Sequence, residues 1–248
     1  MTKRVALVTG GNGGIGTELC RALHDGGHTV VTTCLDPERE AVAEWKQALA
    51  DDGVEVDWVQ CDVSDFPSCE RMADVVRERY GAVDVLVNAA GITRDGFLHK
   101  MPQQDWESVI RVNLGSAYNV TRQFIESMRE RGYGRVVNIA SVNGQTGQFG
   151  QTNYSAAKAG LHGFTMALAK EGARKNVTAN TVSPGYVQTP MLEAIPETVL
   201  DQIVAQIPVG RLARPAEIAR VVAFLAHADA GYITGANIPV NGGYFVSF

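Results

Sequence analysis

Three side chains have the types and spacing needed to move a proton: Ser141, Tyr154 and Lys158. Tyr154 and Lys158 are four residues apart, so they share one face if the segment is helical. A phenol with an ordinary pKa of about 10 is a weak acid at neutral pH, and a nearby ammonium group lowers that pKa. Ser141 precedes Tyr154 by thirteen residues and could donate a hydrogen bond to a carbonyl oxygen. The set predicts an acid, Tyr154, that protonates the alkoxide formed when a ketone is reduced.

A glycine-rich stretch near the N-terminus supports this interpretation. It reads Thr9-Gly10-Gly11-Asn12-Gly13-Gly14-Ile15-Gly16, between an apolar run and an amphipathic pattern. Such glycines allow a tight turn and bring backbone N–H groups and a helix N-terminus against a pyrophosphate. A simple turn would also use glycine, and a Tyr–Lys pair alone is common in packed helices. The coincidence of the glycine turn and the Tyr–Lys pair with Ser141 favours a dinucleotide-dependent enzyme.

Short β-branched runs alternate with amphipathic stretches, which is typical of a parallel sheet wrapped by helices. Strands are predicted at Val5–Val8, Thr29–Thr33, Val56–Val59, Val83–Val87, Arg135–Ile139, Thr178–Val182 and Ala236–Val240. Helices are predicted near Ile15–Asp25, Glu38–Ala50, Ser68–Tyr80, Gln103–Arg131, Tyr154–Lys175 and Ala216–Ala226. The predicted fold is α/β: a single-domain, Rossmann-type, doubly wound sheet of seven parallel strands with helices on both faces, spanning residues 1–248. Ligands of such sheets bind at the carboxyl ends of the strands.

Residues 186–208 interrupt the alternation. The segment contains three prolines and shows little periodicity. A long irregular insertion at the ligand end of a sheet is more often a substrate lid than a linker. We therefore expect a lid, with a plain surface excursion as the alternative.

Composition disfavours several classes of function. The chain has 248 residues, of which 45% are hydrophobic and 20% charged, and its net charge of −5 is spread along the sequence. This argues against nucleic acid or an anionic membrane surface as a partner. The four cysteines form no CxxC pair and no histidine lies at ligand spacing, so no metal site is expected. Because no signal-peptide pattern or apolar span of roughly 18 residues is present, we expect a cytoplasmic protein.

The glycine spacing and the polar residues resemble the short-chain dehydrogenase/reductase family over essentially the whole chain. Its TGxxxGxG turn is matched by Gly10, Gly14 and Gly16, and its catalytic tetrad by Asn113, Ser141, Tyr154 and Lys158. The resemblance implies that Lys158 also holds the nicotinamide ribose. It implies as well that Asn113 positions a water linking Lys158 to solvent.

The same resemblance implies the dinucleotide contacts. They are Gly10, Asn12, Gly14, Ile15 and Gly16 in the turn, Cys34, Asp36 and Arg39 after the second strand, Asp62 and Val63 after the third, Asn88, Ala89 and Gly91 after the fourth, Tyr154 and Lys158, and Pro184, Gly185, Val187 and Thr189 after the sixth. Asp62 would bond the adenine, with a helix cap before Pro67 as the alternative. Ala89 replaces the second Asn of the family's NNAG turn and removes one structural hydrogen bond.

The choice between NADH and NADPH depends on the residues after the second strand. NAD enzymes of the family usually end this strand with Asp, where this chain has Cys34. Asp36 and Glu38 would repel a 2′-phosphate and Arg39 would attract it, each by only about 1 kcal/mol at the surface. The balance leans slightly towards NADH or dual use.

The stretch from Ser141 to Tyr154 resembles the acetoacetyl-CoA reductases of polyhydroxybutyrate synthesis. This resemblance implies a CoA thioester bound by Gln148, Phe149, Gln151 and Tyr186, an (R)-3-hydroxybutyryl-CoA product and a homotetramer. One alternative is a 3-oxoacyl carrier-protein reductase of fatty-acid synthesis, which shares the turn and the tetrad. A non-catalytic dinucleotide sensor is a more remote alternative, because such a protein would usually have lost part of the tetrad.

Overall fold

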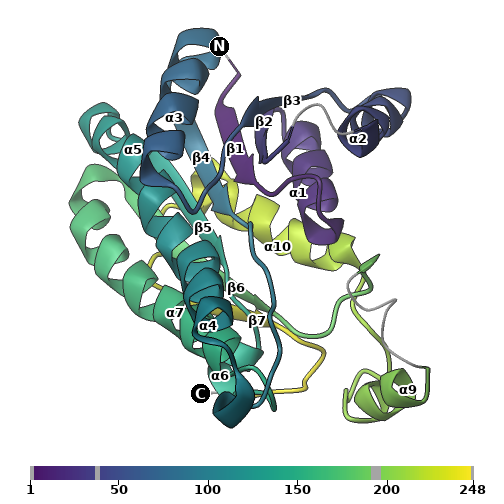
Figure 1. Cartoon of the computed structure of the whole chain (residues 1–248). Coiled ribbons are helices and arrows are strands. Elements are labelled where there is room, and N and C mark those ends of the chain that lie inside the picture. Colours follow the sequence, from purple (N-terminus) through teal and green to yellow (C-terminus); the bar gives the residue numbers. More distant parts are fainter. Residues whose placement is uncertain (1–2, 37–39, 191–196, 247–248) are drawn as a thin grey trace.

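A single sheet of seven parallel strands forms the centre of the molecule (Figure 1). The computed structural model describes residues 3–36, 40–190 and 197–246. The strands are β1 (Val5–Thr9), β2 (Thr29–Cys34), β3 (Val56–Gln60), β4 (Val83–Asn88), β5 (Gly134–Ile139), β6 (Val177–Pro184) and β7 (Asn237–Val240). Their order is β3-β2-β1-β4-β5-β6-β7. The strand order reverses between β1 and β4, which places a ligand crevice at their carboxyl ends and confirms the predicted doubly wound fold.

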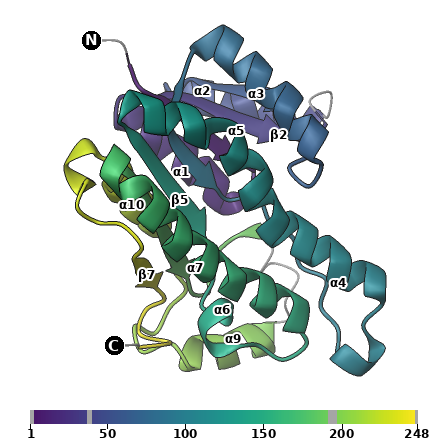
Figure 2. The ribbon, with the colours of Figure 1, turned by 90° about the vertical axis from the view of Figure 1, so that its left-hand side faces the viewer.

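Helices cover both faces of the sheet, and the apolar side chains of the central strands are buried on either face (Figures 1 and 2). One face packs on α1 (Gly14–Asp25), α2 (Glu40–Asp51) and α10 (Pro215–Ala226). The other packs on α3 (Phe66–Tyr80), α5 (Ser116–Arg131) and α7 (Thr152–Gly172). Leu7 points into one core and Val8 into the other, as the two-residue period of a strand requires. Within the described residues, no helix is both long and apolar enough to cross a membrane.

The helix predicted over residues 103–131 is not continuous. It consists of α4 (Gln103–Ile110), a π-helical turn (Arg111–Gly115) and α5. Three short elements were also not predicted: the 3₁₀ turns Leu98–Lys100 and Ala228–Ala230, and the single turn α6 (Asn143–Thr146); the helix predicted to end at Lys175 ends in a 3₁₀ turn, Ala173–Lys175. Short turns of this kind are too brief to produce a periodic pattern.

The expected lid segment contains a helix that its weak periodicity did not predict, α9 (Glu197–Ala205). None of the side chains of α9 is buried, and the helix lies at the same end of the molecule as α4 and α6 (Figure 2). After α9 the chain returns to the body through buried Ile207 and a hydrogen bond from the Val209 N–H to the Gly242 carbonyl. Residues 191–196 of the expected lid lie outside the described residues.

Candidate active site

Three segments at the carboxyl edge of the sheet bring the predicted tetrad together. Ser141 follows β5, Tyr154 and Lys158 lie one turn apart on α7, and Asn113 lies between α4 and α5. The Ser141 hydroxyl lies beside the Tyr154 hydroxyl, close enough to favour the ionised form of the phenol. The Lys158 ammonium lies 5.5 Å from the centroid of the Tyr154 ring and donates a 2.8 Å hydrogen bond to the Ile139 carbonyl. A carbonyl oxygen beside the two hydroxyls would meet a hydrogen-bond donor and a proton source.

Asn113 sits in the π-helical turn, a distortion that is frequent at functional sites. Its amide nitrogen donates to the carbonyls of Ile92 (2.8 Å) and Val109 (3.0 Å). Its amide oxygen is buried and has no hydrogen-bond partner among the described residues. A Cβ built on Gly91 would lie 2.6 Å from this oxygen and 3.6 Å from the Lys158 ammonium, so the glycine leaves the space between them open. A bridging water could connect this oxygen and this ammonium.

The structure corrects the expected effect of Lys158 on Tyr154. Burial raises the pKa of Tyr154 above that of an ordinary phenol, the hydrogen bond with Ser141 offsets part of this rise, and the Asp95 carboxylate adds to it. Lys158 does not reverse the shift, because its ammonium is directed at the Ile139 carbonyl. Burial also lowers the pKa of Lys158 to about 8.

A raised pKa is compatible with an acid that acts on an alkoxide. The phenol stays protonated at neutral pH and is ready to donate. An alkoxide is far more basic than a phenolate, so the transfer is favourable without prior acidification of Tyr154. Tyr154 can therefore serve as the acid, although not for the reason that the sequence suggested.

The glycine turn leads from β1 into the N-terminus of α1. Gly10 adopts a φ of 69°, which favours glycine, and a Cβ on Gly16 would lie 2.1 Å from the Gly10 carbonyl oxygen. The N-cap of α1 is Gly13, so no side chain caps the first N–H groups of this helix. Asn12 is exposed and Ile15 is partly buried beside them. Free amides at a helix N-terminus fit the pyrophosphate of a dinucleotide.

Gly11 was not among the residues predicted to matter for the dinucleotide turn. Its N–H donates a 2.8 Å hydrogen bond to the Thr32 hydroxyl, and a Cβ at this position would lie 2.2 Å from the same oxygen. The Thr32 hydroxyl in turn donates to the Val8 carbonyl. Gly11 therefore joins the turn to β1 and β2, a role that only the pairing of these strands reveals.

The residues expected at the adenosine end are at the carboxyl ends of β2 and β3. Cys34 is buried, Asp36 is exposed and Val63 is buried, whereas Arg39 lies outside the described residues. Asp62 is exposed and accepts a 2.8 Å hydrogen bond from the Ser64 N–H, which closes a local turn. The cap of α3 is Asp65, which accepts from the Ser68 N–H. Asp62 is therefore not the helix cap.

The turn after β4 is tied to the sheet. The Asn88 amide is buried and donates to Thr121 (3.1 Å) and Asn138 (2.8 Å), so its side chain supports the sheet. The N–H groups of Ala89 and Ala90 both donate to the Thr9 hydroxyl. Thr9 thus anchors a turn that lacks the family's second Asn, and Gly91 lies at its exposed end.

The residues expected at the nicotinamide follow β6. Pro184 ends the strand, and a Cβ on Gly185 would lie 2.8 Å from the Asn241 Cα. Val187 packs its side chain into the core, and its neighbours Tyr186 and Gln188 use their backbone groups to pair with Ala213. The N–H and carbonyl of Val187 therefore face the opposite direction, where a carboxamide could bind.

Thr189 reaches back to the glycine turn. A Cβ on Gly14 would lie 2.8 Å from the Thr189 methyl group, so Gly14 permits this close approach. The start of the expected lid segment thus lies against the turn expected to hold the pyrophosphate.

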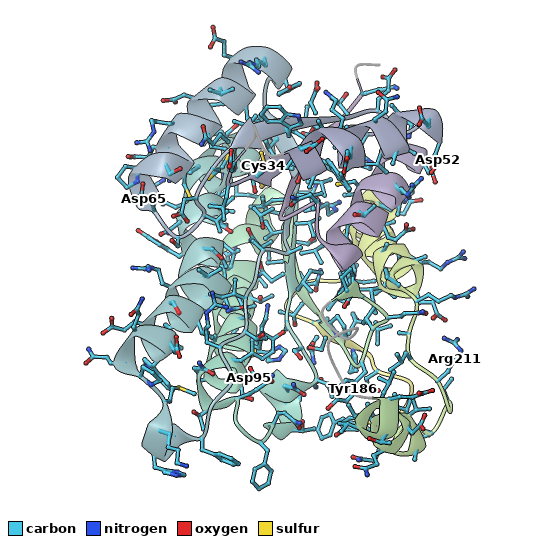
Figure 3. All side chains as sticks on the ribbon, turned by 45° about the vertical axis from the view of Figure 1, so that its right-hand side comes forward. Cys34, Asp52, Asp65, Asp95, Tyr186 and Arg211 are labelled. Atoms are coloured by element: carbon cyan, nitrogen blue, oxygen red, sulfur yellow. The ribbon has the colours of Figure 1, made fainter. Side chains whose placement is uncertain are left out.

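Tyr186, one of the expected substrate residues, lies in the lower part of the molecule in Figure 3, as does Asp95, which is bonded to the expected substrate residue Gln151. Phe149 is 87% exposed and makes an edge contact with Phe97, at 6.2 Å between centroids. Gln148 is exposed nearby, and Gln151 is bonded to Asn143 and Asp95. Tyr186 makes an edge contact of 5.6 Å with Tyr244, and burial together with Tyr244 raises the pKa of Tyr186 to about 12.

Three residues of this region were not predicted: Phe97, Asn143 and Tyr244. Phe97 and Tyr244 are aromatic residues in segments with no periodic pattern, and only the folded chain brings them to Phe149 and Tyr186. Asn143 lies two residues after Ser141. That proximity was the one available signal.

The comparisons with known proteins agree with this geometry. The profile of a family described as enoyl-(acyl carrier protein) reductase matches residues 10–245. The acetoacetyl-CoA reductase of Allochromatium vinosum is 57% identical, over 98% of this chain and 99% of its own length. The acetoacetyl-CoA reductase of Cupriavidus necator is 54% identical, over 98% of each chain. The 3-oxoacyl-[acyl-carrier-protein] reductase of Haemophilus influenzae is 40% identical, over the whole of both chains. The chain therefore belongs to the short-chain dehydrogenase/reductase family.

Proposed function

We propose that this enzyme reduces acetoacetyl-CoA to (R)-3-hydroxybutyryl-CoA, using NADH or NADPH, and so supplies polyhydroxyalkanoate synthesis. The observation that carries the proposal is the identity of 57% and 54% to two acetoacetyl-CoA reductases over nearly the whole chain. The side chains around Ser141 and Tyr154 support it, because they offer a donor and an acid to a single carbonyl oxygen.

In this proposal Ser141 donates a hydrogen bond to the 3-keto oxygen and Tyr154 gives it a proton as charge develops there. Lys158 holds the ribose of the dinucleotide, and the Asn113 amide oxygen positions the water through which the proton is resupplied. The bound dinucleotide supplies the hydride. Tyr154 must regain its proton after each turnover, and its raised pKa favours that step.

The dinucleotide is held along the carboxyl edge of the sheet. Backbone amides at Gly14, Ile15 and Gly16 bind the pyrophosphate, Asp62 and Val63 the adenine, and the Val187 backbone and Thr189 the carboxamide. The uncapped N-terminus of α1 supports the first of these contacts. Because the exposed carboxylate of Asp36 follows the buried Cys34, we propose NADH or dual use over strict NADPH use.

The thioester lies between the loop that carries Phe149 and Tyr186, the first residue of the expected lid segment. Gln148 and one amide hydrogen of Gln151 bond the thioester and pantetheine carbonyls, and the rings of Phe149 and Tyr186 enclose the short acyl chain. The 87% exposure of Phe149 supports this assignment, since a large apolar ring at the surface is stabilised by a ligand that covers it.

We also propose a homotetramer that works in the cytoplasm. Large apolar side chains are exposed on several elements, among them Tyr118, Met166, Phe224 and Tyr232, and apolar groups of this kind become buried in subunit interfaces. The four cysteines are all unpaired, as is usual in a reducing compartment. Light scattering after size-exclusion chromatography tests the tetramer.

Steady-state kinetics test the substrate. Acetoacetyl-CoA and the matching carrier-protein thioester are compared, each with NADH and with NADPH. We expect the higher kcat/KM with the CoA ester. A much higher kcat/KM with the carrier-bound substrate would refute the proposal and favour a 3-oxoacyl carrier-protein reductase, the activity named for the relative that is 40% identical.

A further inference from the structure

A chain of polar groups runs from the loop after β4 to Ser141. The Asp95 carboxylate accepts a 2.9 Å hydrogen bond from the amide nitrogen of Gln151. The amide oxygen of Gln151 accepts a 2.8 Å bond from the amide nitrogen of Asn143. The backbone N–H of Asn143 donates a 3.1 Å bond to the hydroxyl oxygen of Ser141. The chain thus connects three separate segments to one hydroxyl of the tetrad.

The direction of these hydrogen bonds follows from the charge of Asp95. An ionised carboxylate only accepts hydrogen bonds, so the nitrogen of Gln151 has to face it. The oxygen of Gln151 then faces Asn143, which has to present its own nitrogen. The polarity of both amides therefore follows from chemistry and not from an arbitrary assignment of their oxygen and nitrogen atoms.

Asp95 and Gln151 both lie next to backbone that is fixed by hydrogen bonds. The Gly96 N–H donates a 2.8 Å bond to the Gly150 carbonyl. Asn153, which is fully buried, donates a 2.9 Å bond to the Arg94 carbonyl and accepts one from the Tyr154 N–H. The loop that carries Asp95 is therefore held against the start of α7, so the carboxylate is a fixed point for Gln151.

We propose that Asn143 is a positioning residue for Ser141, held in place through Gln151 and Asp95. The N–H of Asn143 occupies one lone pair of the serine oxygen, which leaves the serine proton to point at the Tyr154 hydroxyl and at the keto oxygen. α6 is a single turn of four residues, and the side chain of Asn143 ties it to α7. The inference rests on the proposed function, in which Ser141 binds the keto oxygen of acetoacetyl-CoA.

The first test is Asn143→Ala. This variant keeps the backbone N–H and removes the tie to Gln151. We expect kcat for acetoacetyl-CoA to fall about tenfold, the factor that one ordinary hydrogen bond is worth, while KM stays within about twofold of the wild-type value. A raised KM with unchanged kcat would make Asn143 a substrate contact and overturn the proposal.

The second test moves the negative charge of this series of hydrogen bonds from position 95 to position 151. Gln151→Glu places a second carboxylate against Asp95, and we expect kcat to fall by about tenfold or more. In the double variant Asp95→Asn/Gln151→Glu, the new amide at position 95 can donate to the new carboxylate at position 151, whose other oxygen still accepts from Asn143. We expect this double variant to regain most of the kcat that Gln151→Glu loses, while KM stays raised in both variants, because both lack the amide hydrogen of Gln151 that is proposed to bond the thioester. A double variant as slow as Gln151→Glu alone would refute the positioning chain.

A matched control is Gln47→Glu, which makes the same change in a Gln–Asp pair exposed on α2, with 2.8 Å between Gln47 and Asp51. Its kcat is expected to stay within about twofold of wild type. Melting temperatures are measured for every variant, and if Gln151→Glu does not fold, Asn143→Ala decides alone. A wild type inactive on acetoacetyl-CoA but active on another 3-oxoacyl thioester refutes the proposed substrate only, and the variants are then compared on that thioester.

Discussion

Tyr154→Phe removes the hydroxyl proposed as the acid and leaves the ring in place. The neighbours of this hydroxyl offer no equivalent donor. Ser141 already accepts from the Asn143 N–H, and its hydroxyl is a much weaker acid than a phenol. The Lys158 ammonium donates to the Ile139 carbonyl and lies 5.5 Å from the ring centroid. The proton would then have to come from water or from a displaced Lys158.

General acids contribute about 10²-fold to 10⁴-fold to a rate, or roughly 3–5 kcal/mol of barrier. Since no side chain in direct contact replaces Tyr154, we expect kcat to fall about 10³-fold. The fold should be little affected, because the ring stays in place and the variant no longer has to bury a polar hydroxyl. The melting temperature should therefore stay close to that of the wild type.

The assay is the loss of NADH absorbance with saturating acetoacetyl-CoA, beside a fluorescence titration of NADH binding. We expect a dissociation constant for NADH within about threefold of wild type, because Lys158 and the glycine turn are intact. A variant that keeps a tenth or more of the wild-type kcat would show that another group supplies the proton. Loss of both turnover and NADH binding would show that the ring position, and not the hydroxyl, had been disturbed.

Three further predictions follow from the geometry. Gly16→Ala should raise the dissociation constant for NADH at least about tenfold in a fluorescence titration, because the alanine Cβ would lie 2.1 Å from the Gly10 carbonyl oxygen. An unchanged dissociation constant would show that the turn can move aside. Lys158→Met should abolish turnover yet raise the free energy of unfolding at pH 7 by about 1–3 kcal/mol in urea, because the folded state holds this lysine at a pKa of about 8, below its unfolded value. Between the two pKa values the folded state binds fewer protons than the unfolded state, so the free energy of unfolding of the wild type rises with pH there. The difference in free energy of unfolding between Lys158→Met and the wild type should therefore narrow above about pH 8. A difference that does not change with pH would refute the lowered pKa of Lys158. Asp65→Ala should lower the free energy of unfolding by about 1 kcal/mol, because the cap of α3 is lost, and should leave NADH affinity unchanged. Asp62→Ala should weaken NADH binding with little loss of stability. The opposite result would make Asp62 the cap of α3 and Asp65 the contact to the dinucleotide.

The sheet and the tetrad were predictable because their signals are local. Seven apolar runs spaced by amphipathic segments leave few topologies open once crossovers are right-handed. Tyr154 and Lys158 share a helix face by spacing alone, and Gly10, Gly14 and Gly16 stand where a strand passes into a helix. Each of these inferences depends on a few neighbouring residues and on a period that the backbone imposes.

Electrostatics and side-chain partners were not predictable from local patterns. The sequence places an ammonium one helical turn from a phenol, which suggests a lowered pKa for Tyr154. The folded chain instead directs Lys158 at the Ile139 carbonyl, and burial raises the pKa of Tyr154. A pKa depends on the solvent exposure and the distances of all surrounding groups, and these exist only after packing.

The amino-acid sequence by itself determined the seven strands and the main helices between them, the glycine turn between β1 and α1, and the helix face shared by Tyr154 and Lys158, because period and spacing are properties of neighbouring residues. Only the tertiary structure decided that Asp65 and not Asp62 caps α3, that a π-helical turn presents Asn113, and that Asp95 and Gln151 reach Ser141 through Asn143. These contacts join residues from different loops, and loops have no periodic sequence pattern that would predict which residues come into contact.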